Sequence, residues 1–249
     1  MKVVAIIQTR MGSTRLPGKV MKPILGIPLI QHMMERLSRC RNLDEVVIAT
    51  TDNPQDRTIV DFAEKNGYLI GIGSENDVLA RYGKVARERN ADHVVRLTSD
   101  CPLIDPDVTD RVVEAHLNSK KNDLTSNVFT RSYPRGLDTE VLSRPCIQRL
   151  FNETDDPLYR EHVTNYIHDH PEKFVLENVA QDENDSDGRW CVDTERDLEF
   201  VTKVYRALYP QNAFFSYEDV RSYLCEHPAI QAINADVPQT KIFRRKARL

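Results

Sequence analysis

The sequence predicts an α/β fold, a Rossmann-like three-layer α/β/α sandwich with a mostly parallel, mixed sheet. Two observations support this. Apolar, β-rich runs alternate with segments of helical periodicity through the first half of the chain. The segments between these runs are long enough to hold a helix, as connections between parallel strands require. The 249 residues, 40% of them hydrophobic, are enough for one large domain with a substantial core.

The expected elements follow from this alternation. The first run, Val3–Gln8, carries no charge, which is typical of a strand buried on both faces. Further strands are expected at 45–51, 93–98 and 174–179. Helices are expected at 29–37, 54–66, 78–86, 107–117, 158–168 and 198–208, and a polar, exposed loop at 182–188.

Composition and charge exclude several classes of protein. A formal net charge of −4 is unsuited to a general nucleic-acid binder, which needs a cationic face. The first apolar run is too short for a signal-peptide core, and no stretch reaches the length of a membrane helix. The five cysteines are scattered and form no CxxC pair, which is typical of reduced thiols. We therefore expect a cytoplasmic protein that binds neither nucleic acid nor membrane.

A cationic loop follows the first strand. Its sequence, residues 8–19, is QTRMGSTRLPGK, and it lies where open α/β sheets bind ligands, at the carboxyl end of a strand. Its backbone amides, together with Arg10, Arg15 and Lys19, are suited to neutralise a triphosphate. The loop is not a Walker A sequence, because five residues rather than four separate its glycines. The alternative is a solvated loop with incidental charge.

Two carboxylates, Asp100 and Asp193, are candidates for a metal site. Asp100 follows the expected strand 93–98, so its side chain should project from the same sheet edge as the cationic loop. A carboxylate beside a triphosphate is unfavourable unless a cation lies between them, which makes Asp100 a candidate magnesium ligand. The alternative is a turn residue before Pro102. Asp193 lies just ahead of an expected helix, where physical chemistry alone favours N-capping.

Six segments resemble the signatures of one enzyme family and occur in the family's order. They are 6–20 (IIQTRMGSTRLPGKV), 73–82 (GSENDVLARY), 96–102 (RLTSDCP), 136–140 (GLDTE), 160–164 (REHVT) and 192–194 (VDT). From Met1 to about Leu208 the chain is similar to the cytidylyltransferases that make CMP-activated acidic sugars, such as the 3-deoxy-manno-octulosonate and acylneuraminate enzymes. Within that superfamily it resembles the spore coat polysaccharide biosynthesis protein SpsF group, whose long first segment is highly specific.

The resemblance implies a fold of the nucleotide-diphospho-sugar transferase type. It also implies transfer of CMP from Mg-CTP to a hydroxyl of an acidic sugar or sugar-like acid, with release of pyrophosphate, in surface polysaccharide biosynthesis. The alternatives are a sugar-1-phosphate nucleotidyltransferase and a nucleotide-sugar-dependent glycosyltransferase. A non-catalytic nucleotide-binding subunit is less favoured.

The resemblance further suggests a homodimer and a division of one domain. Residues 1–120 are expected to form a nucleotide-binding half, and residues 121–230 an acceptor-binding and dimerisation half. A basic tail, 231–249, follows, and we expect its last nine residues, which carry five basic side chains, to be disordered.

By the same resemblance, Asp193 is the second metal ligand beside Asp100, which leaves Thr194 to cap the helix. Arg10 and Lys19 are expected to act with these two aspartates in catalysis. The expected nucleotide-binding residues are Gln8, Thr9, Arg10, Met11, Gly12, Arg15, Lys19, Ser74, Asp77, Arg81 and Ser99. Asp77 is alternatively a helix cap.

The expected acceptor site uses charged residues of the second half, because an arginine suits a carboxylate and a carboxylate suits sugar hydroxyls. The candidates are Arg135, Asp138, Glu140, Arg160, Glu161 and His162. The alternative is a cluster of salt bridges at the surface or at a dimer contact.

Overall fold

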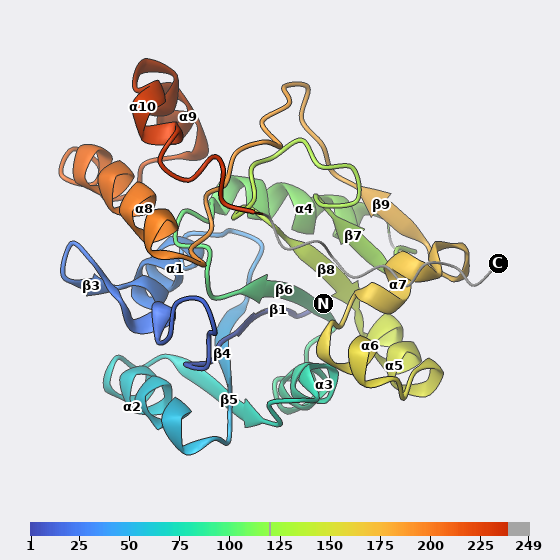
Figure 1. Ribbon diagram of the computed structural model, residues 1–249. Coiled ribbons are helices and arrows are strands. Elements are labelled where there is room, and N and C mark those ends of the chain that lie inside the picture. The colour runs from blue at the N-terminus through green and yellow to red at the C-terminus, as the bar shows by residue number, and fades with distance from the viewer. Residues whose placement is uncertain (120, 239–249) are drawn as a thin grey trace.

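A computed structural model describes residues 1–119 and 121–238 (Figure 1). Its centre is a seven-stranded sheet with the order β5-β4-β1-β6-β8-β7-β9. The strands are β1 (Val3–Gln8), β4 (Glu45–Thr51), β5 (Leu69–Gly73), β6 (His93–Thr98), β7 (Leu124–Ser126), β8 (Glu140–Ser143) and β9 (Leu176–Asn178). Strands β5, β4, β1 and β6 are parallel, whereas β8 is antiparallel to both of its neighbours. A small ribbon of β2 (Pro23–Ile24) and β3 (Ile27–Pro28) stands apart.

Helices cover both faces of the sheet. The longer ones are α1 (Leu29–Leu37), α2 (Arg57–Lys65), α3 (Val78–Glu88), α4 (Pro106–Ser119), α5 (Arg144–Glu153), α8 (Glu195–Leu208) and α9 (Tyr217–Glu226). The shorter ones are α6 (Pro157–Glu161), α7 (Asn165–Asp169), α10 (Pro228–Gln231) and the 3₁₀ turns η1 (Lys19–Met21), η2 (Pro54–Asp56) and η3 (Pro171–Lys173). In Figure 1, α3, α5 and α6 lie together, away from α1 and α8.

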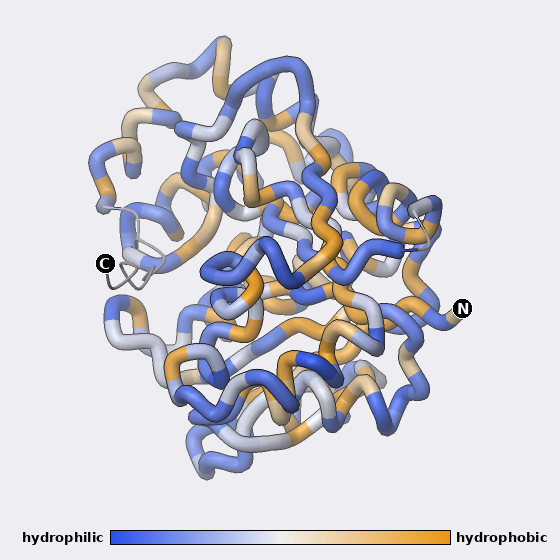
Figure 2. The backbone as a smooth tube through the Cα atoms, turned by 90° about the vertical axis from the view of Figure 1, so that its right-hand side faces the viewer, coloured by the Kyte–Doolittle hydropathy of each residue, from blue (hydrophilic) through white to orange (hydrophobic). Residues whose placement is uncertain are grey.

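Two hydrophobic clusters, one on each face of the sheet, explain this layering. Alternate residues of β1 belong to different clusters: Ala5 and Ile7 pack with α1, α4 and α8, whereas Val4 and Ile6 pack with α3 and α5. Because side chains of a strand point alternately to opposite faces, β1 is buried on both sides. Figure 2 shows the hydrophobic segments gathered toward the middle of the molecule. The predicted three-layer sandwich with a mixed, mostly parallel sheet is confirmed.

The elements with strong periodicity match their predictions. The three strands expected in the first half are β1, β4 and β6, with the predicted bounds. The helix expected over 158–168 was wrong as one element: it is split into α6 and α7, because His162 leaves the helical region with φ −106° and ψ 75°. Several elements were not predicted, since each is brief or only weakly patterned: the strands β2, β3, β5, β7 and β8 and the helices α5, α9 and α10.

The C-terminal segment divides into two parts. Residues 231–238 belong to the described structure, whereas 239–249, including the basic stretch Lys241–Leu249, lie outside the described residues. None of the helices within 1–119 and 121–238 is long and apolar enough to span a membrane.

Candidate active site

A cavity of about 260 Å³ opens at the carboxyl ends of β1 and β6. Eleven of the predicted site residues line it: Gln8, Thr9, Arg10, Arg15, Lys19, Arg81, Ser99, Asp100, Glu161, His162 and Asp193. They come from five separate parts of the chain, namely the cationic loop, the start of α3, the end of β6 and two segments of the second half. The sheet therefore brings most of the predicted nucleotide and metal residues to one place.

The cationic loop is held by its own backbone and by one distant carboxylate. The Met11 carbonyl accepts hydrogen bonds from the backbone amides of Ser13, at 2.8 Å, and Gly18, at 3.0 Å. The Met11 amide donates to Asp56 Oδ1 at 2.6 Å. Gly18 has a φ of 67°, a left-handed conformation that glycine adopts at little cost, and it is the N-cap of η1. This turn directs Lys19 back toward the sheet edge.

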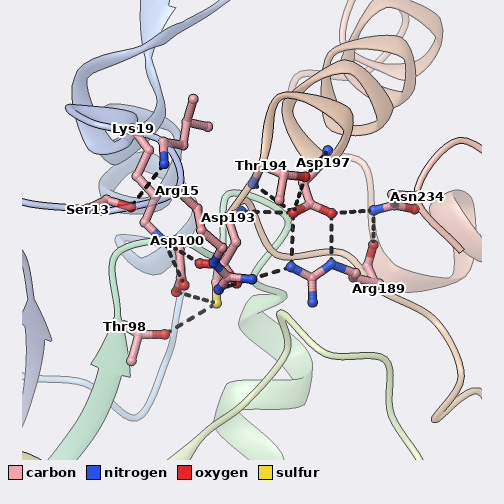
Figure 3. Close-up of polar contacts among 12 residues, drawn as sticks. Ser13, Arg15, Lys19, Thr98, Asp100, Arg189, Asp193, Thr194, Asp197 and Asn234 are labelled. Atoms are coloured by element: carbon pink, nitrogen blue, oxygen red, sulfur yellow. Dashed lines mark hydrogen bonds and ion pairs between the residues drawn. The ribbon is translucent and has the colours of Figure 1, made fainter. Parts of the chain in front are cut away.

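Lys19 joins the two predicted metal ligands (Figure 3). Its ammonium donates to Asp100 Oδ2 at 3.0 Å and to Asp193 Oδ1 at 2.7 Å, although these residues lie 81 and 174 positions away. The Lys19 side chain is only 12% exposed. The two carboxylates thus lie close enough to contact one cation.

The charges of this cluster depend on one another. Burial acts to raise the pKa of Asp100, but the Lys19 ammonium and hydrogen bonds from Thr98 and Cys101 outweigh it and hold that pKa at about 2. Burial likewise acts to lower the pKa of Lys19, yet Asp100 and Asp193 raise it above its ordinary value. Lys19 and Asp100 are therefore charged at neutral pH.

Asp193 is not the cap of the helix that follows it. Thr194 is the N-cap of α8, and its hydroxyl forms a reciprocal capping box with Asp197. The carboxylate of Asp193 instead contacts Lys19, Arg15 at 2.9 Å and Arg189 at 3.1 Å. Of the two roles that sequence reasoning left open, capping is wrong.

Arg81 reaches the cavity from a buried position on α3. The residue is 3% exposed, and its Nη1 donates to the Ser74 carbonyl at 2.7 Å. Its Nε has no hydrogen-bond partner, and burial lowers the pKa of the guanidinium. At the rim, Arg10 pairs with Glu75 at 3.2 Å. Both arginines are positioned to meet an anionic ligand.

Four predicted nucleotide residues do not line the cavity. Met11 and Gly12 shape the loop behind it, and Ser74 accepts a hydrogen bond from the Asp77 amide at 3.2 Å. Asp77 caps α3 by accepting from the Ala80 amide at 2.8 Å. Residues 74–77 are therefore held against the start of α3 by hydrogen bonds.

Three of the six predicted acceptor residues form ion pairs with other charged residues. Arg160 pairs with Asp77 at 2.5 Å and so joins α6 to α3. Asp138 pairs with Arg131 at 2.6 and 2.8 Å. Glu140 is buried in β8 against Arg96, whose charge outweighs the effect of burial and lowers the pKa of Glu140 to about 2.

Arg135 lies beside Arg189, with which it forms a parallel β-bridge. Of the six predicted acceptor residues, only Glu161 and His162 line the cavity.

Sequence reasoning missed several lining residues: Ser13, Thr14, Glu75, Val78 and Thr98. Four of these lie inside the segments 6–20 and 73–82, and Thr98 is the last residue of β6, so their positions were a usable signal. Arg189 carried no such signal, because its contact with Asp193 depends on the fold of the loop between them.

Comparison with known proteins shows one family. Residues 4–223 match the family described as Cytidylyltransferase. An uncharacterised protein of Methanocaldococcus jannaschii is 30% identical over 241 residues, which cover 96% of this chain and 97% of the relative. The spore coat polysaccharide biosynthesis protein SpsF of Bacillus subtilis is 31% identical over 211 residues, 82% of this chain and 86% of the relative. A 3-deoxy-manno-octulosonate cytidylyltransferase of Trichlorobacter lovleyi is 36% identical over 121 residues, 48% of this chain and 46% of the relative.

Two solved structures are similar. A cytidylyltransferase from Leptospira borgpetersenii has a TM-score of 0.89 at 33% identity, covering 97% of this chain and 100% of that one. A CMP:2-keto-3-deoxy-manno-octonic acid synthetase complexed with CTP has a TM-score of 0.66 at 20% identity, covering 83% and 99% of the two chains. The second likeness is one of fold.

Proposed function

This chain belongs to the cytidylyltransferase family, and from that premise we propose that it transfers CMP from CTP to a hydroxyl of an acidic sugar or sugar-like acid. The observation that carries the proposal is the cavity in which Lys19 joins Asp100 and Asp193 beside the cationic loop. The relative SpsF, which is named for spore coat polysaccharide biosynthesis, supports a role in making a surface polysaccharide.

The residues of the cluster fit a magnesium ion, the proposed cofactor. Asp100 and Asp193 supply carboxylate oxygens near a common point, and Mg²⁺ is usually held by one or two carboxylates together with substrate phosphates. Residues 1–119 and 121–238 contain no group of three or more His, Cys, Asp or Glu that could hold a metal by themselves. When bound, the ion would polarise the α-phosphate and offset charge on the departing pyrophosphate.

The protein's own part is alignment and charge neutralisation. The acceptor hydroxyl attacks the α-phosphorus in line, and the bond to the oxygen that bridges to the β-phosphate breaks. Arg10, Arg15 and Lys19 line the cavity and would offset the charge of the triphosphate. Arg81, which also lines the cavity, would donate to the nucleotide through its guanidinium group.

For the acceptor we propose Glu161 and His162, because both line the cavity at the end of α6. Glu161 is suited to accept hydrogen bonds from sugar hydroxyls, and His162 is suited to donate to a carboxylate. The homodimer and the cytoplasmic location remain predictions.

Pyrophosphate release is the direct test. The purified chain would be assayed with CTP, UTP, ATP and GTP in turn, each with Mg²⁺ and a panel of sugar acids and sugar 1-phosphates. We expect release with CTP and a sugar acid, and none when the acceptor is omitted. Turnover with sugar 1-phosphates alone would support the sugar-1-phosphate alternative. No turnover with any pair would contradict the proposed activity.

A further inference from the structure

Three buried residues lie on the opposite side of Asp193 from Lys19 (Figure 3). They are Arg189, Asp197 and Asn234, with exposed fractions of 5%, 0% and 2%. We propose that these three residues form a positioning unit that holds Asp193 in the orientation in which its carboxylate binds a divalent cation. The proposal rests on the proposed function, because Asp193 requires this orientation only as a metal ligand.

The unit holds both the backbone and the side chain of Asp193. Asp197 Oδ2 accepts a hydrogen bond from the Asp193 amide at 3.0 Å and from the Thr194 amide at 2.9 Å. Arg189 Nη2 donates to Asp193 Oδ2 at 3.1 Å. The other oxygen, Oδ1, points to Lys19. One oxygen of Asp193 is therefore held by Arg189, and the other is directed to Lys19, which lines the cavity.

Of the two arginines that contact Asp193 Oδ2, Arg189 is the more buried. Arg15 touches the same Asp193 oxygen at 2.9 Å, but the Arg15 side chain is 42% exposed, whereas that of Arg189 is 4% exposed. Arg189 is also bound by Asp197 through two parallel hydrogen bonds, at 2.8 and 2.9 Å. A bidentate pair of this kind fixes the plane of the guanidinium group.

The pairing with Asp197 also affects how strongly the positive charge of Arg189 acts on Asp193. An unbalanced guanidinium beside Asp193 would compete with a metal ion for its negative charge. Because Asp197 balances that charge, Arg189 can orient Asp193 while leaving it available to a divalent cation. The pair is thus suited to position a ligand without neutralising it.

Asn234 is the third member of the positioning unit. It lies beyond residue 223, where the match to the family ends. Its Nδ2 donates to Asp197 Oδ1 and to the Arg189 carbonyl, both at 2.9 Å. Arg196 of α8 donates to the carbonyl of Ile233 at 2.7 Å, so the segment after α10 is anchored to α8. Asn234 therefore connects this C-terminal segment to the proposed metal ligand.

Asn234→Ala is the cleanest test, because it changes no charge. The probe is Mn²⁺ in the presence of CTP, because the two carboxylates would hold the ion together with substrate phosphates. Its binding to the full-length chain can be followed by electron paramagnetic resonance. Replacing residues that hold metal ligands commonly weakens metal affinity about 10- to 100-fold. We expect Asn234→Ala to raise the Mn²⁺ dissociation constant toward the lower end of that range. We expect Asp197→Asn to raise the Mn²⁺ dissociation constant more, because Asp193 alone then balances the positive charge of Arg189.

The matched control is Asn122→Ala. Asn122 is 8% exposed and, like Asn234, donates to a carboxylate, that of Glu177, and to a second oxygen, Thr125 Oγ1 at 3.0 Å. It lies outside the cavity and should leave Mn²⁺ binding as in the wild type.

The outcomes distinguish a failure of the positioning unit from a failure of the metal site. If Asn234→Ala lowers the melting temperature as Asn122→Ala does but binds Mn²⁺ as the wild type does, Asn234 has a structural role and the positioning unit is refuted. If Asp197→Asn does not fold, Mn²⁺ binding by Asn234→Ala still distinguishes a positioning role from a structural one. If the wild type binds no Mn²⁺ in the presence of CTP, or Asp193→Asn binds it equally well, the proposed metal site itself fails.

Discussion

The two halves of the chain use their charged residues differently. In the first half, Arg10, Arg15 and Lys19 follow one another along a single loop, and all three line the cavity. In the second half, the predicted acceptor residues are scattered, and several are engaged in ion pairs, such as Arg160 with Asp77. Charged residues at the carboxyl end of a buried strand thus face a cavity, whereas charged residues within or between packed elements join those elements.

The largest expected effect is on kcat, at the proposed metal site, to which each half contributes one aspartate. Asp100→Asn and Asp193→Asn each remove a carboxylate from the proposed metal site, and the loss of such a preorganised electrostatic contribution lowers kcat by about 10²- to 10³-fold. The measurement is Mg²⁺-dependent pyrophosphate release, with circular dichroism to check the fold. Asp107→Asn, at a 68% exposed side chain that pairs with Arg41, is the control. Unchanged turnover in either variant would remove that residue from the metal site.

A second, smaller effect tests the cationic loop. Lys19→Ala should weaken CTP binding about 10- to 100-fold, as expected for the loss of hydrogen bonds to charged groups. The KM for the acceptor should change much less. Dissociation constants for CTP and KM values for the acceptor would be measured separately. Lys22→Ala, which removes a lysine one turn later that pairs with exposed Glu195, is the matched control. Equal effects of Lys19→Ala on both substrates would contradict the assignment to the triphosphate.

A third prediction concerns stability in the second half. Glu140 has its pKa lowered from 4.5 to about 2 in the folded state, so its contribution is present above pH 4.5 and is lost as the pH falls toward 2. Glu140→Gln should lower the free energy of unfolding by about 3 kcal/mol at pH 7, and the difference from the wild type should shrink in acid. Urea unfolding at several pH values measures this. An unchanged stability with a raised acceptor KM would instead make Glu140 an acceptor residue.

The smallest effect is expected where the halves pack through α3 and α6. Asp77→Ala and Arg160→Ala should each destabilise the protein, and a double-mutant cycle should give a coupling energy of about 1 kcal/mol, as for a partly exposed ion pair. Unfolding free energies of the two single variants and the double variant provide the cycle. Additive effects would deny the pairing. If the acceptor KM rises in Arg160→Ala but not in Asp77→Ala, Arg160 contacts the acceptor after all.

The sequence by itself determined much of the first half of this protein, although strand β5 was not predicted. The strands β1, β4 and β6 and the loop after β1 could be predicted because each is a continuous segment with its own periodicity or composition. The carboxyl ends of parallel strands share one edge of a sheet, so the order of strands and loops along the chain was enough to expect Lys19 and Asp100 near each other.

Only the tertiary structure decided what the charged residues of the second half contact. Glu140 meets Arg96 because β8 lies beside β6, and Arg160 meets Asp77 because α6 packs on α3. Arg189, Asp197 and Asn234 meet because the chain returns from α10 to the start of α8. A charged side chain is equally suited to a ligand or to an opposite charge. Which one it contacts depends on the order in which elements pack, and local hydrophobic periodicity does not encode that order.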